Sequence, residues 1–599
     1  MRAQGGKRVS ERKYRVNIQD RYFSDERGNA FYREPLKDAA GFQDIPFMNF
    51  WPELVQLRRL DDGFTVSDKI IFSAFRNGVH ESPVELEKRD MIGNQPQAKF
   101  SAGCRVFKGK SNIARCGELL EMQCEDAETH TCYSHTGWKI INGERVFLNG
   151  ENSVTADGLT DRYTVELDSD LRRCYRFTAG NISETGAFDA LLNRMPKAVP
   201  DWLLVPSLAY VFLSPLNSML REKGAEPSFC FYLIGKTGSY KSSWVKVMLS
   251  FFGQLGYAET APITFLDTQN AIGRKLALGA DIPLLLDDRR PTNNAADKMR
   301  YEGIEKYVSS AIGDRAARGR LNADATARAS YIARCNLIVT AEEAFQNIGS
   351  SSIARSVSVE LKPDSICFDE LRELQARADQ LNRVMVLFLQ WLIANYEGVS
   401  DSADAKLMQY REFFTGAGHP RLATAFSQLM FGYSVMLAFL QDKGRIDQNR
   451  AAEMRSRAKD IFLSMCEQQS EKVDGERPTK LFSDLLTEML YTRQIRIVDL
   501  SNTEGTEGNL FISDKTVGFQ DGSYLYLIPR AAYSAVLQYY SRSGYTFPAS
   551  PAALWKQFKD EGKLICDGDR LDKRKTINGK TQRYVCLLVS VIDSESEKE

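Results

Sequence analysis

The chain has 599 residues, 43% apolar and 26% charged, and its basic and acidic residues balance at a formal net charge of zero. This length predicts several domains of ordinary globular composition. Zero net charge excludes a general attraction to nucleic acid, so such binding would need local basic patches. Residues 1–15 lack the apolar stretch of a secretion signal, and apolar runs such as 384–392 and 431–440 are too short to span a membrane. The eleven cysteines have no framework spacing, which predicts reduced thiols in a cytoplasmic protein without a membrane segment.

The first third of the chain changes from polar to strand-rich. Residues 1–45 are polar and mixed in charge, and they predict a partly ordered N-terminal arm. Residues 46–184 predict a mixed α/β domain for DNA engagement or assembly. Within it, 137–148 reads as two short strands joined by an Asn-Gly turn, which is a strong hairpin signal. The alternation of apolar and polar residues over 163–167 predicts a half-buried strand.

Residues 185–228 have helical apolar spacing interrupted by prolines and predict a helical connector. The apolar run 229–234 that follows predicts a buried strand. Helical periodicity resumes over 242–252, where the aromatic residues fit a helix core. A strand, a glycine-containing loop and a helix therefore follow one another directly. They open a predicted core over 229–365.

The loop between this strand and helix is the most informative motif in the chain. Its sequence fits G-x-x-x-x-G-K-[ST], except that Tyr240 replaces the second glycine. Such loops cradle phosphates with backbone N–H groups, direct the lysine to the β/γ-phosphates and place the last hydroxyl on Mg²⁺. Without glycine, we expect position 240 to adopt a backbone angle that an aromatic residue tolerates. The predicted ATP-binding residues are Gly235, Lys236, Thr237, Gly238, Ser239, Tyr240, Lys241, Ser242 and Ser243.

A second acidic motif follows at the distance that such a loop requires. The apolar run 282–286 ends in Asp287 and Asp288, as a Walker B strand does. Asp287, with Ser242, would hold the magnesium shell, and Asp288 would polarise the attacking water as general base. A buried strand that ends in a solvated acidic turn is the alternative. The strand, loop and helix upstream favour the metal site.

Two further residues complete the predicted catalytic set with Lys241 and Asp288. The strand predicted over 335–340 ends at Thr340, a candidate polar sensor of the γ-phosphate or its water, and Asn336 is a weaker candidate. Arg355 precedes an alternating strand over 356–361. It could project from a subunit edge and stabilise charge on a neighbour's phosphoryl group. A surface arginine or a structural ion pair is the alternative.

Two regions carry basic residues suited to nucleic acid. The glycine-containing stretch 313–334 is rich in arginine, whose guanidinium groups bind phosphates. A solvated or nucleotide-contacting loop is an equally good interpretation there. The other region is a basic hairpin near the C-terminus. The candidate nucleic-acid contacts are Arg315, Arg318, Arg320, Arg328, Lys573, Arg574, Lys575 and Lys580.

The C-terminal half predicts a helical segment over 366–470 and a separate domain over 471–599. In that domain, Ser550-Pro551 begins a helix with Leu554, Trp555 and Phe558 on its apolar face. The basic hairpin follows, with an Asn-Gly turn at its tip. A helix followed by a two-stranded wing predicts a winged-helix-like domain.

A metal site in the first domain is a weaker reading. Cys116, Cys124, His130, Cys132 and His135 are close in sequence, but they lack the paired knuckle spacing of structural zinc. Ordinary thiols and hydrogen-bonded imidazoles are the preferred interpretation.

The loop 235–242, with its aromatic residue before the lysine, resembles that of helicase-like ATPases of prophages, genomic islands and other mobile elements. That family resembles the superfamily III helicases within the AAA+ ATPases. The acid pair, the arginine stretch from Gly313, the turn after Thr340 and the segment ending at Arg355 fall in the same order. So do the 135–138 motif with its hairpin and the stretch 522–529. The resemblance covers about residues 100 to 590, and Arg289-Arg290 after the acids departs from it.

The resemblance implies an α/β multidomain protein with a central P-loop AAA+ core. It implies a hexameric ring that hydrolyses ATP with Mg²⁺ between subunits, with Arg355 acting in trans. Single-stranded or forked DNA would pass through a central channel, and a polymerase or primase would be a partner in mobile-element replication. Two other functions stay open: a remodelling or defence ATPase without unwinding, and a DNA-binding initiator that uses ATP as an assembly switch.

Overall fold

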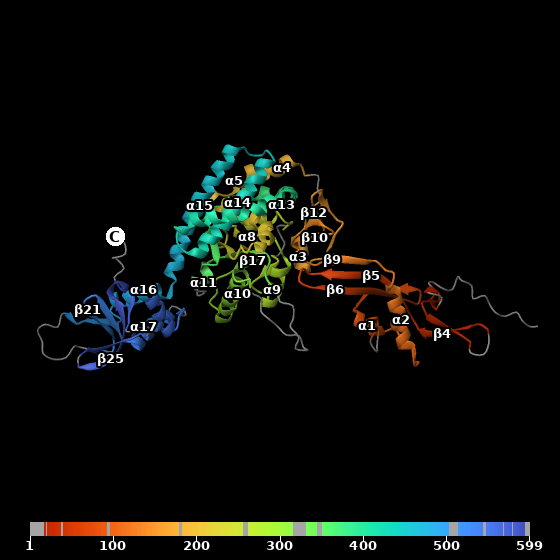
Figure 1. The fold of residues 1–599 in the computed structure, drawn as a ribbon, viewed down its shortest axis with the longest axis horizontal. Coiled ribbons are helices and arrows are strands. Elements are labelled where there is room, and N and C mark those ends of the chain that lie inside the picture. Colours follow the sequence, from red (N-terminus) through yellow and green to blue (C-terminus); the bar gives the residue numbers. More distant parts are fainter. Residues whose placement is uncertain are drawn as a thin grey trace, which may run out of the picture.

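The computed structural model describes residues 17–18, 21–36, 40–92, 96–178, 182–255, 261–315, 331–343, 350–501, 513–542, 547–566, 568, 570–577 and 579–592. They form three lobes in a row along the longest axis (Figure 1). The N-terminal lobe and the C-terminal lobe lie at opposite ends, and the large central lobe separates them. Two described helical segments, 201–222 and 420–442, are long and apolar enough to cross a membrane, but 94% and 89% of their apolar windows are buried in the central lobe.

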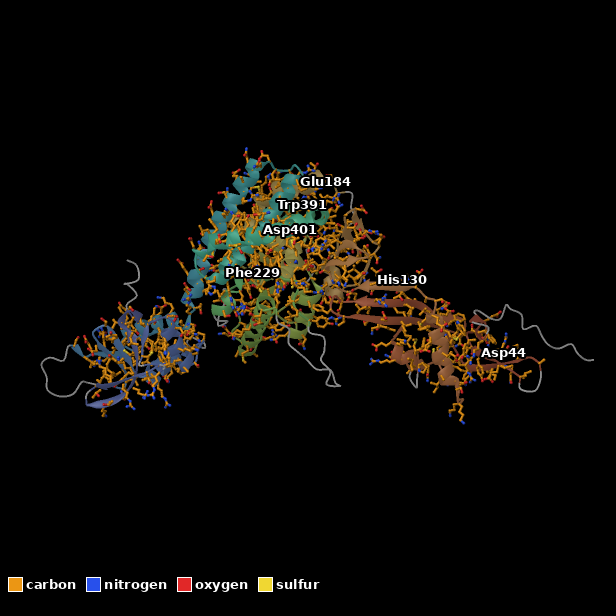
Figure 2. All side chains as sticks on the ribbon, in the orientation of Figure 1. Asp44, His130, Glu184, Phe229, Trp391 and Asp401 are labelled. Atoms are coloured by element: carbon orange, nitrogen blue, oxygen red, sulfur yellow. The ribbon has the colours of Figure 1, made fainter. Side chains whose placement is uncertain are left out.

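The N-terminal lobe is built from two sheets and short helices around one core. The first sheet is antiparallel and the second is mixed, with the order β14-β9-β5-β6-β7 and β8 paired to β6. Strands β5, β6 and β9 reach from this lobe to the central lobe, and His130 marks that bridge (Figure 2). The elements are β1 (Asn17–Ile18), β2 (Tyr22–Ser24), β3 (Ala30–Pro35), β4 (Phe42–Met48), β5 (Trp51–Asp61), β6 (Val66–Arg76), β7 (Val79–His80), β8 (Val84–Leu86), α1 (Lys88–Ile92), η2 (Pro96–Lys99), α2 (Asn112–Cys124), β9 (Thr129–Tyr133) and β14 (Thr164–Val165).

These strands correct the predicted polar arm over 1–45. From Tyr22 onward the described residues form β2, β3 and β4 with their connecting turns, and Tyr22 and Ala30 lie in the core of the lobe. The turn around Gly28 joins β2 to β3, and a Cβ there would lie 2.2 Å from the Phe75 carbonyl oxygen. The apolar residues are sparse because the sheet buries only one face.

The predicted domain over 46–184 also divides differently. The Asn-Gly hairpin is confirmed as β10 and β11, with Ile141 opposite Glu144. Its sheet packs into the core of the central lobe through residues such as Phe147 and Val154. The elements of this part are β10 (Gly137–Ile141), β11 (Glu144–Leu148), β12 (Ser153–Thr155), β13 (Gly158–Thr160) and α3 (Ser169–Cys174).

The segment 185–228 is part of the central core rather than a connector. In α6, eleven consecutive residues from Leu203 to Leu213 are buried, so the helix is apolar all round. The elements are α4 (Glu184–Asp189), the π-helix η3 (Ala190–Arg194), α5 (Met195–Ala198), α6 (Asp201–Leu213), η4 (Ser214–Leu216) and α7 (Asn217–Glu222).

A parallel five-stranded sheet forms the centre of the central lobe, in the order β16-β17-β18-β15-β19. The strands predicted over 229–234, 282–286, 335–340 and 356–361 are all present, as is the helix after the loop. The elements are β15 (Cys230–Ile234), α8 (Lys241–Leu249), β16 (Ile263–Thr264), α9 (Gln269–Leu278), β17 (Pro283–Arg289), α10 (Ala295–Gly313), β18 (Asn336–Ala341), α11 (Ser350–Ile353) and β19 (Ser356–Glu360).

Long helices cover the sheet, as predicted for 366–470, and α15 leads toward the C-terminal lobe (Figure 1). The helices are α12 (Phe368–Ala376), α13 (Ala378–Thr415), α14 (Pro420–Asp442) and α15 (Gln448–Gly475). On the edge strand β19, the Gln469 side chain both accepts from Ser358 N at 3.0 Å and donates to Ser358 O at 2.9 Å. The amide thus replaces a neighbouring strand and protects the edge.

The C-terminal lobe combines three helices with a sheet of order β20-β21-β22-β25-β23, to which β24 adds by pairing with β25. The helix predicted from Ser550 is present, and Ser550 Oγ accepts from Ala553 N at its first turn. Leu554, Trp555 and Phe558 are buried, and the basic hairpin is β24–β25. The elements are α16 (Pro478–Tyr491), β20 (Arg496–Asp499), β21 (Thr516–Asp521), β22 (Tyr524–Leu527), α17 (Pro529–Arg542), α18 (Pro551–Asp560), β23 (Leu564–Ile565), β24 (Lys573–Ile577), β25 (Lys580–Leu588) and η6 (Val589–Val591).

Candidate active site

The loop 235–240 lies at the carboxyl edge of the central sheet, between β15 and α8. Register places the end of β18 beside the end of β15, with Leu233 opposite Thr340. The end of β17 lies on the other side of β18, with Leu286 opposite Val339. The predicted loop, acids and sensor therefore meet at one edge, where open parallel sheets bind their ligands.

A chain of hydrogen bonds joins the predicted polar residues at this edge. Ser242 Oγ donates to Asp287 Oδ1 at 2.7 Å. Thr340 Oγ1 donates to the same oxygen and accepts from Asp288 N at 2.9 Å. The single proton of the Thr340 hydroxyl is thus used by Asp287. In this structure Thr340 orients the two acids, and it has no proton left to donate to a phosphate oxygen.

The other sensor candidate, Asn336, is excluded by its position. It begins β18, at the opposite edge of the sheet, and is fully buried. Its amide donates to Ser214 Oγ and its carbonyl oxygen accepts from Asn217. The residue therefore anchors η4 and the start of α7 under the sheet.

The loop has the features of an anion site. Lys241 is 7% exposed, and we find no ion pair for it among the described residues. A buried lysine usually needs an anionic partner. The first N–H groups of α8 have no intrahelical acceptor, and no side chain in the described part of the chain caps them. Ser239 Oγ is buried without a hydrogen-bond partner among the described residues. These groups fit bound phosphate, and the hydroxyl–carboxylate pair of Ser242 and Asp287 fits Mg²⁺, a cation that prefers oxygen ligands.

Tyr240 differs from the expectation for its backbone. Its φ is 57° and its ψ is 20°, which is the left-handed conformation that glycine normally supplies. For an L-residue this costs about 1–2 kcal/mol. Its ring packs against Phe368 with centroids 5.1 Å apart, which offsets about 0.5–1.5 kcal/mol of that cost. The loop thus has, at Tyr240, the left-handed backbone conformation that a glycine would normally adopt there.

Two contacts at this edge were not foreseen. Glu342, two residues after Thr340, accepts from Thr237 Oγ1 at 2.6 Å and so holds the loop to β18. Arg290 forms an ion pair with Asp288. Both residues directly follow a strand that ends at the site. That position in the sequence was the signal by which they could have been predicted.

The unusual Arg289-Arg290 pair has two separate roles. Arg289 points into the core and pairs with the buried Glu305 at 2.9 Å. Burial raises the pKa of Glu305 to about 7, against the opposing effect of Arg289. Arg290 is exposed and faces Asp288, so only Arg290 belongs to the candidate site.

Comparisons with known proteins add the following. Residues 102–305 match a family described as a domain of unknown function (DUF927). A solved structure described as SCCmec type IV Cch, active helicase, aligns with 97% of this chain and 99% of that chain, at a TM-score of 0.61 and 13% identity. The chain therefore has the multidomain fold of that protein. Structures of JCV helicase, free and inhibitor-bound, align with 46% of this chain at TM-scores of 0.21 and 0.20 and identities of 14% and 13%, which carries no argument about fold. No curated protein matches the chain.

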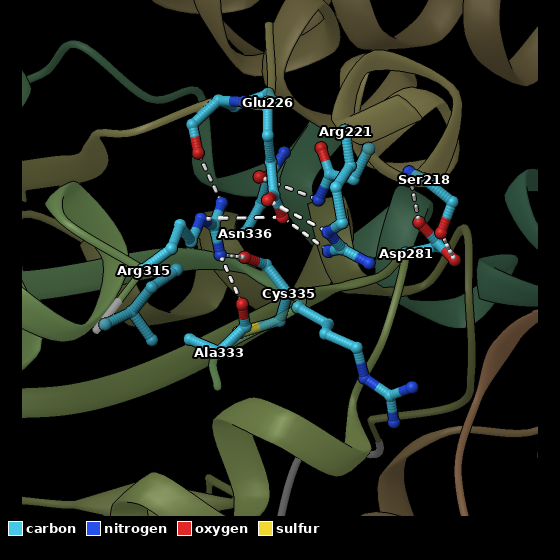
Figure 3. A network of polar contacts seen from close by, with 12 residues as sticks. Ser218, Arg221, Glu226, Asp281, Arg315, Ala333, Cys335 and Asn336 are labelled. Carbon is cyan, nitrogen blue, oxygen red and sulfur yellow. Dashed lines mark hydrogen bonds and ion pairs between the residues drawn. The ribbon is translucent and has the colours of Figure 1, made fainter. Parts of the chain in front are cut away.

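Arg315 does not have the predicted role of a DNA contact. Its guanidinium donates to the carbonyl oxygens of Ala333, Cys335 and Pro227, and its Nε lies 3.5 Å from Glu226 Oε1. Figure 3 shows it inside this polar network. The forked donors of the arginine side chain thereby hold these chain segments together below the sheet. Arg318, Arg320 and Arg328 lie outside the described residues.

Arg355 lies at the other edge of the sheet. Its neighbour Ser356 begins β19 opposite Cys230, the first residue of β15. Its guanidinium bonds to Asp314 Oδ1 and donates to Ser351 Oγ at 2.6 Å. The five residues of β15 separate it from the loop by about 16 Å. Arg355 therefore cannot reach a ligand in the loop of its own chain.

In the C-terminal hairpin the basic residues fall into two groups. Lys575 pairs with Asp521 and lies 3.9 Å from the centroid of the Tyr526 ring, so it is held against the sheet. Lys573 also has an interaction partner. Arg574 and Lys580 are exposed at the hairpin, and neither has an ion pair among the described residues. These two are the cations available to a partner.

The fold does not support the zinc interpretation. Cys116 is buried in α2, and burial raises its pKa to about 12. His135 is buried just after the end of β9. Its Nδ1 lies 2.7 Å from Thr136 O, and burial lowers its pKa to about 4. No group of three or more potential ligands that could hold a metal ion occurs among the residues that the structure describes.

Proposed function

We propose that this chain is an ATP-hydrolysing DNA helicase or translocase with a P-loop core of the AAA+ and superfamily III type. In this proposal it acts in the cytoplasm as a hexameric ring and replicates a mobile element or prophage. The observation that carries the proposal is the hydrogen-bonded set of Ser242, Asp287, Asp288 and Thr340 beside the buried Lys241. The strand order of the core sheet and the likeness to a protein described as an active helicase support it.

In the proposed mechanism the loop binds the triphosphate of ATP. Backbone N–H groups of the loop and of the first turn of α8 surround the phosphates, and the Lys241 ammonium neutralises their charge. Ser242 and Asp287 would hold Mg²⁺, which supplies further charge neutralisation when bound. The hydrogen bond between their side chains already holds the two oxygen atoms 2.7 Å apart.

Asp288 would accept the proton of the attacking water. Its backbone N–H is fixed by Thr340, which sets the direction of its side chain. The ion pair with Arg290 engages Oδ2 of the Asp288 carboxylate and leaves Oδ1 to accept the proton. Arg290 thus orients the base.

We predict that Tyr240→Gly leaves both stability and hydrolysis close to those of the parent. The loss of the ring contact and the relief of the left-handed backbone are opposite effects of about 1 kcal/mol each. Tyr240→Val should lose most activity, because a β-branched residue resists a positive φ and would turn the loop amides away. Hydrolysis rates and thermal unfolding of the two variants test this, and equal loss in both would contradict it.

Thr340→Val should lower hydrolysis about 10–100-fold, because the isosteric side chain breaks both hydrogen bonds that orient the acids. Thr340→Ser keeps the hydroxyl and should remain active. The comparison is made at saturating ATP, so that the turnover rate rather than binding is measured. A serine variant as slow as the valine variant would show that the methyl group, not the hydroxyl, matters.

The C-terminal lobe would bind duplex DNA as a winged helix. The double variant Arg574→Ala/Lys580→Ala should weaken duplex binding about tenfold at moderate salt and flatten its salt dependence, because two phosphate contacts are lost. Binding is measured by fluorescence anisotropy over a salt series. Lys480→Ala on α16, which removes a cation paired with Asp484, is the matched control and should bind normally. Unchanged binding in the double variant would exclude the wing as the contact.

The decisive experiment measures ATP hydrolysis with and without single-stranded DNA, together with unwinding of a forked duplex. A helicase should show DNA-stimulated hydrolysis and strand separation. A hydrolysis rate that DNA does not change would favour the remodelling or defence ATPase. Duplex binding with ATP-dependent assembly but no stimulated turnover would favour the initiator.

A further inference from the structure

A cavity of about 270 Å³ opens at the edge of the core sheet opposite the loop. The residues just before β15 and just before β19 line it, among them Phe229, which Figure 2 labels. Its lining includes three arginines from three elements: Arg355 before β19, Arg411 near the end of α13, and Arg421 in the first turn of α14. Neither a motif nor the spacing along the sequence brings the last two together with the first.

The cations in this cavity are not balanced by the described residues. Ser351 Oγ accepts from Arg355 at 2.6 Å and from Arg421 at 3.4 Å, so two guanidinium groups converge on one hydroxyl. Asp314 is the one carboxylate, among the described residues, that pairs with any of the three arginines. The guanidinium groups of Arg355 and Arg421 repel each other, and an anion bound between them would relieve that repulsion.

The N-terminus of α14 adds to the positive potential. Arg421 stands in the first turn of this 23-residue helix, where the helix dipole disfavours a cation. His419 precedes it, and its Nδ1 accepts from Arg421 N at 3.2 Å. Burial and the nearby Arg477 and Arg421 lower the pKa of His419, which favours its neutral form, so it brings no negative charge to the cavity. Three guanidinium groups and a helix N-terminus therefore face one cavity.

We infer that Arg411 and Arg421 join Arg355 in binding the triphosphate held by the loop of a second copy of this chain. The inference rests on the proposed function, because ATP must occupy that loop. The cavity cannot serve the loop of its own chain, since the full length of β15 lies between them. An oligophosphate with several charges matches three arginines better than a single carboxylate does.

This arrangement also explains how copies would assemble. A phosphate-binding loop at one edge of the sheet and its arginine receptor at the other form a heterologous, head-to-tail interface. Such interfaces generate closed rings when the rotation between copies closes. The Asp314 contact of Arg355 would be exchanged for phosphate when a second copy docks.

Subunit mixing tests the inference with full-length protein. Arg411→Ala and Arg421→Ala should each reduce hydrolysis about 10²-fold, the effect of losing one charge-stabilising donor. Mixing Arg421→Ala with Lys241→Ala should raise hydrolysis well above the sum of the separate variants. In the mixture, Lys241 from the first variant meets Arg421 from the second at one intact interface. Arg450→Ala, whose side chain pairs with Glu453 outside the cavity, is the matched control and should behave like the parent.

Four other outcomes are informative. Normal hydrolysis by both arginine variants would overturn the inference. So would a slow Arg421→Ala variant that gains nothing on mixing, because its arginine would then act within its own chain. Binding of inorganic tripolyphosphate by Lys241→Ala that depends on Arg421, without any gain on mixing, would identify a free anion as the ligand and overturn the second copy as its source. Retained hydrolysis by Lys241→Ala alone would instead refute the proposed function.

Discussion

Lys241→Ala is expected to reduce ATP hydrolysis by about 10³-fold, together with a loss of ATP binding. The ammonium is buried at the start of α8, and no described carboxylate pairs with it. In the proposed complex it is the cation nearest the β- and γ-phosphates, where charge grows in the transition state. Alanine removes that charge and leaves the backbone of the loop intact.

The control for this prediction lies on the same helix. Lys246→Ala removes a lysine from the last turn of α8, away from the loop, and should leave hydrolysis unchanged. Both rates are measured at several ATP concentrations, so that binding and turnover separate. If Lys241→Ala hydrolyses ATP at the parent rate, the loop does not bind the nucleotide.

The local elements of the core could be predicted because each carries its own signal. The apolar strand before Gly235, the strand before Asp287 and the strand ending at Thr340 are buried on both faces and read as continuous apolar runs. Their polar ends then meet by topology, since parallel strands bring their carboxyl ends to one edge. The geometry of Ser242, Asp287 and Thr340 was therefore accessible from sequence.

The remaining features depend on partners far away in sequence. The described part of the presumed arm forms strands because Tyr22 packs against Phe47 of the same sheet and shares its core with residues much later in the sequence. Arg315 was wrongly placed on DNA because its acceptors, such as Ala333 O and Pro227 O, come from separate segments. Tyr240 was expected to avoid a left-handed backbone, and only the packing of Phe368 from α12 shows why it does not. Pattern and spacing contain none of these contacts.

Arg355→Ala should lower the turnover rate by about 10³-fold or more and leave ATP binding nearly unchanged, as expected for an arginine supplied to a neighbour's nucleotide. Gly313 leaves room for this side chain, because a Cβ at that position would lie 2.2 Å from Arg355 Cδ. Asp314→Asn is the matched variant, because it removes the partner of Arg355 within the chain and keeps the guanidinium. If Arg355 serves a neighbour's phosphate, Asp314→Asn retains hydrolysis while Arg355→Ala loses it. If the ion pair is only structural, the two variants lose hydrolysis and thermal stability together, and a role for Arg355 at a neighbour's phosphate is excluded.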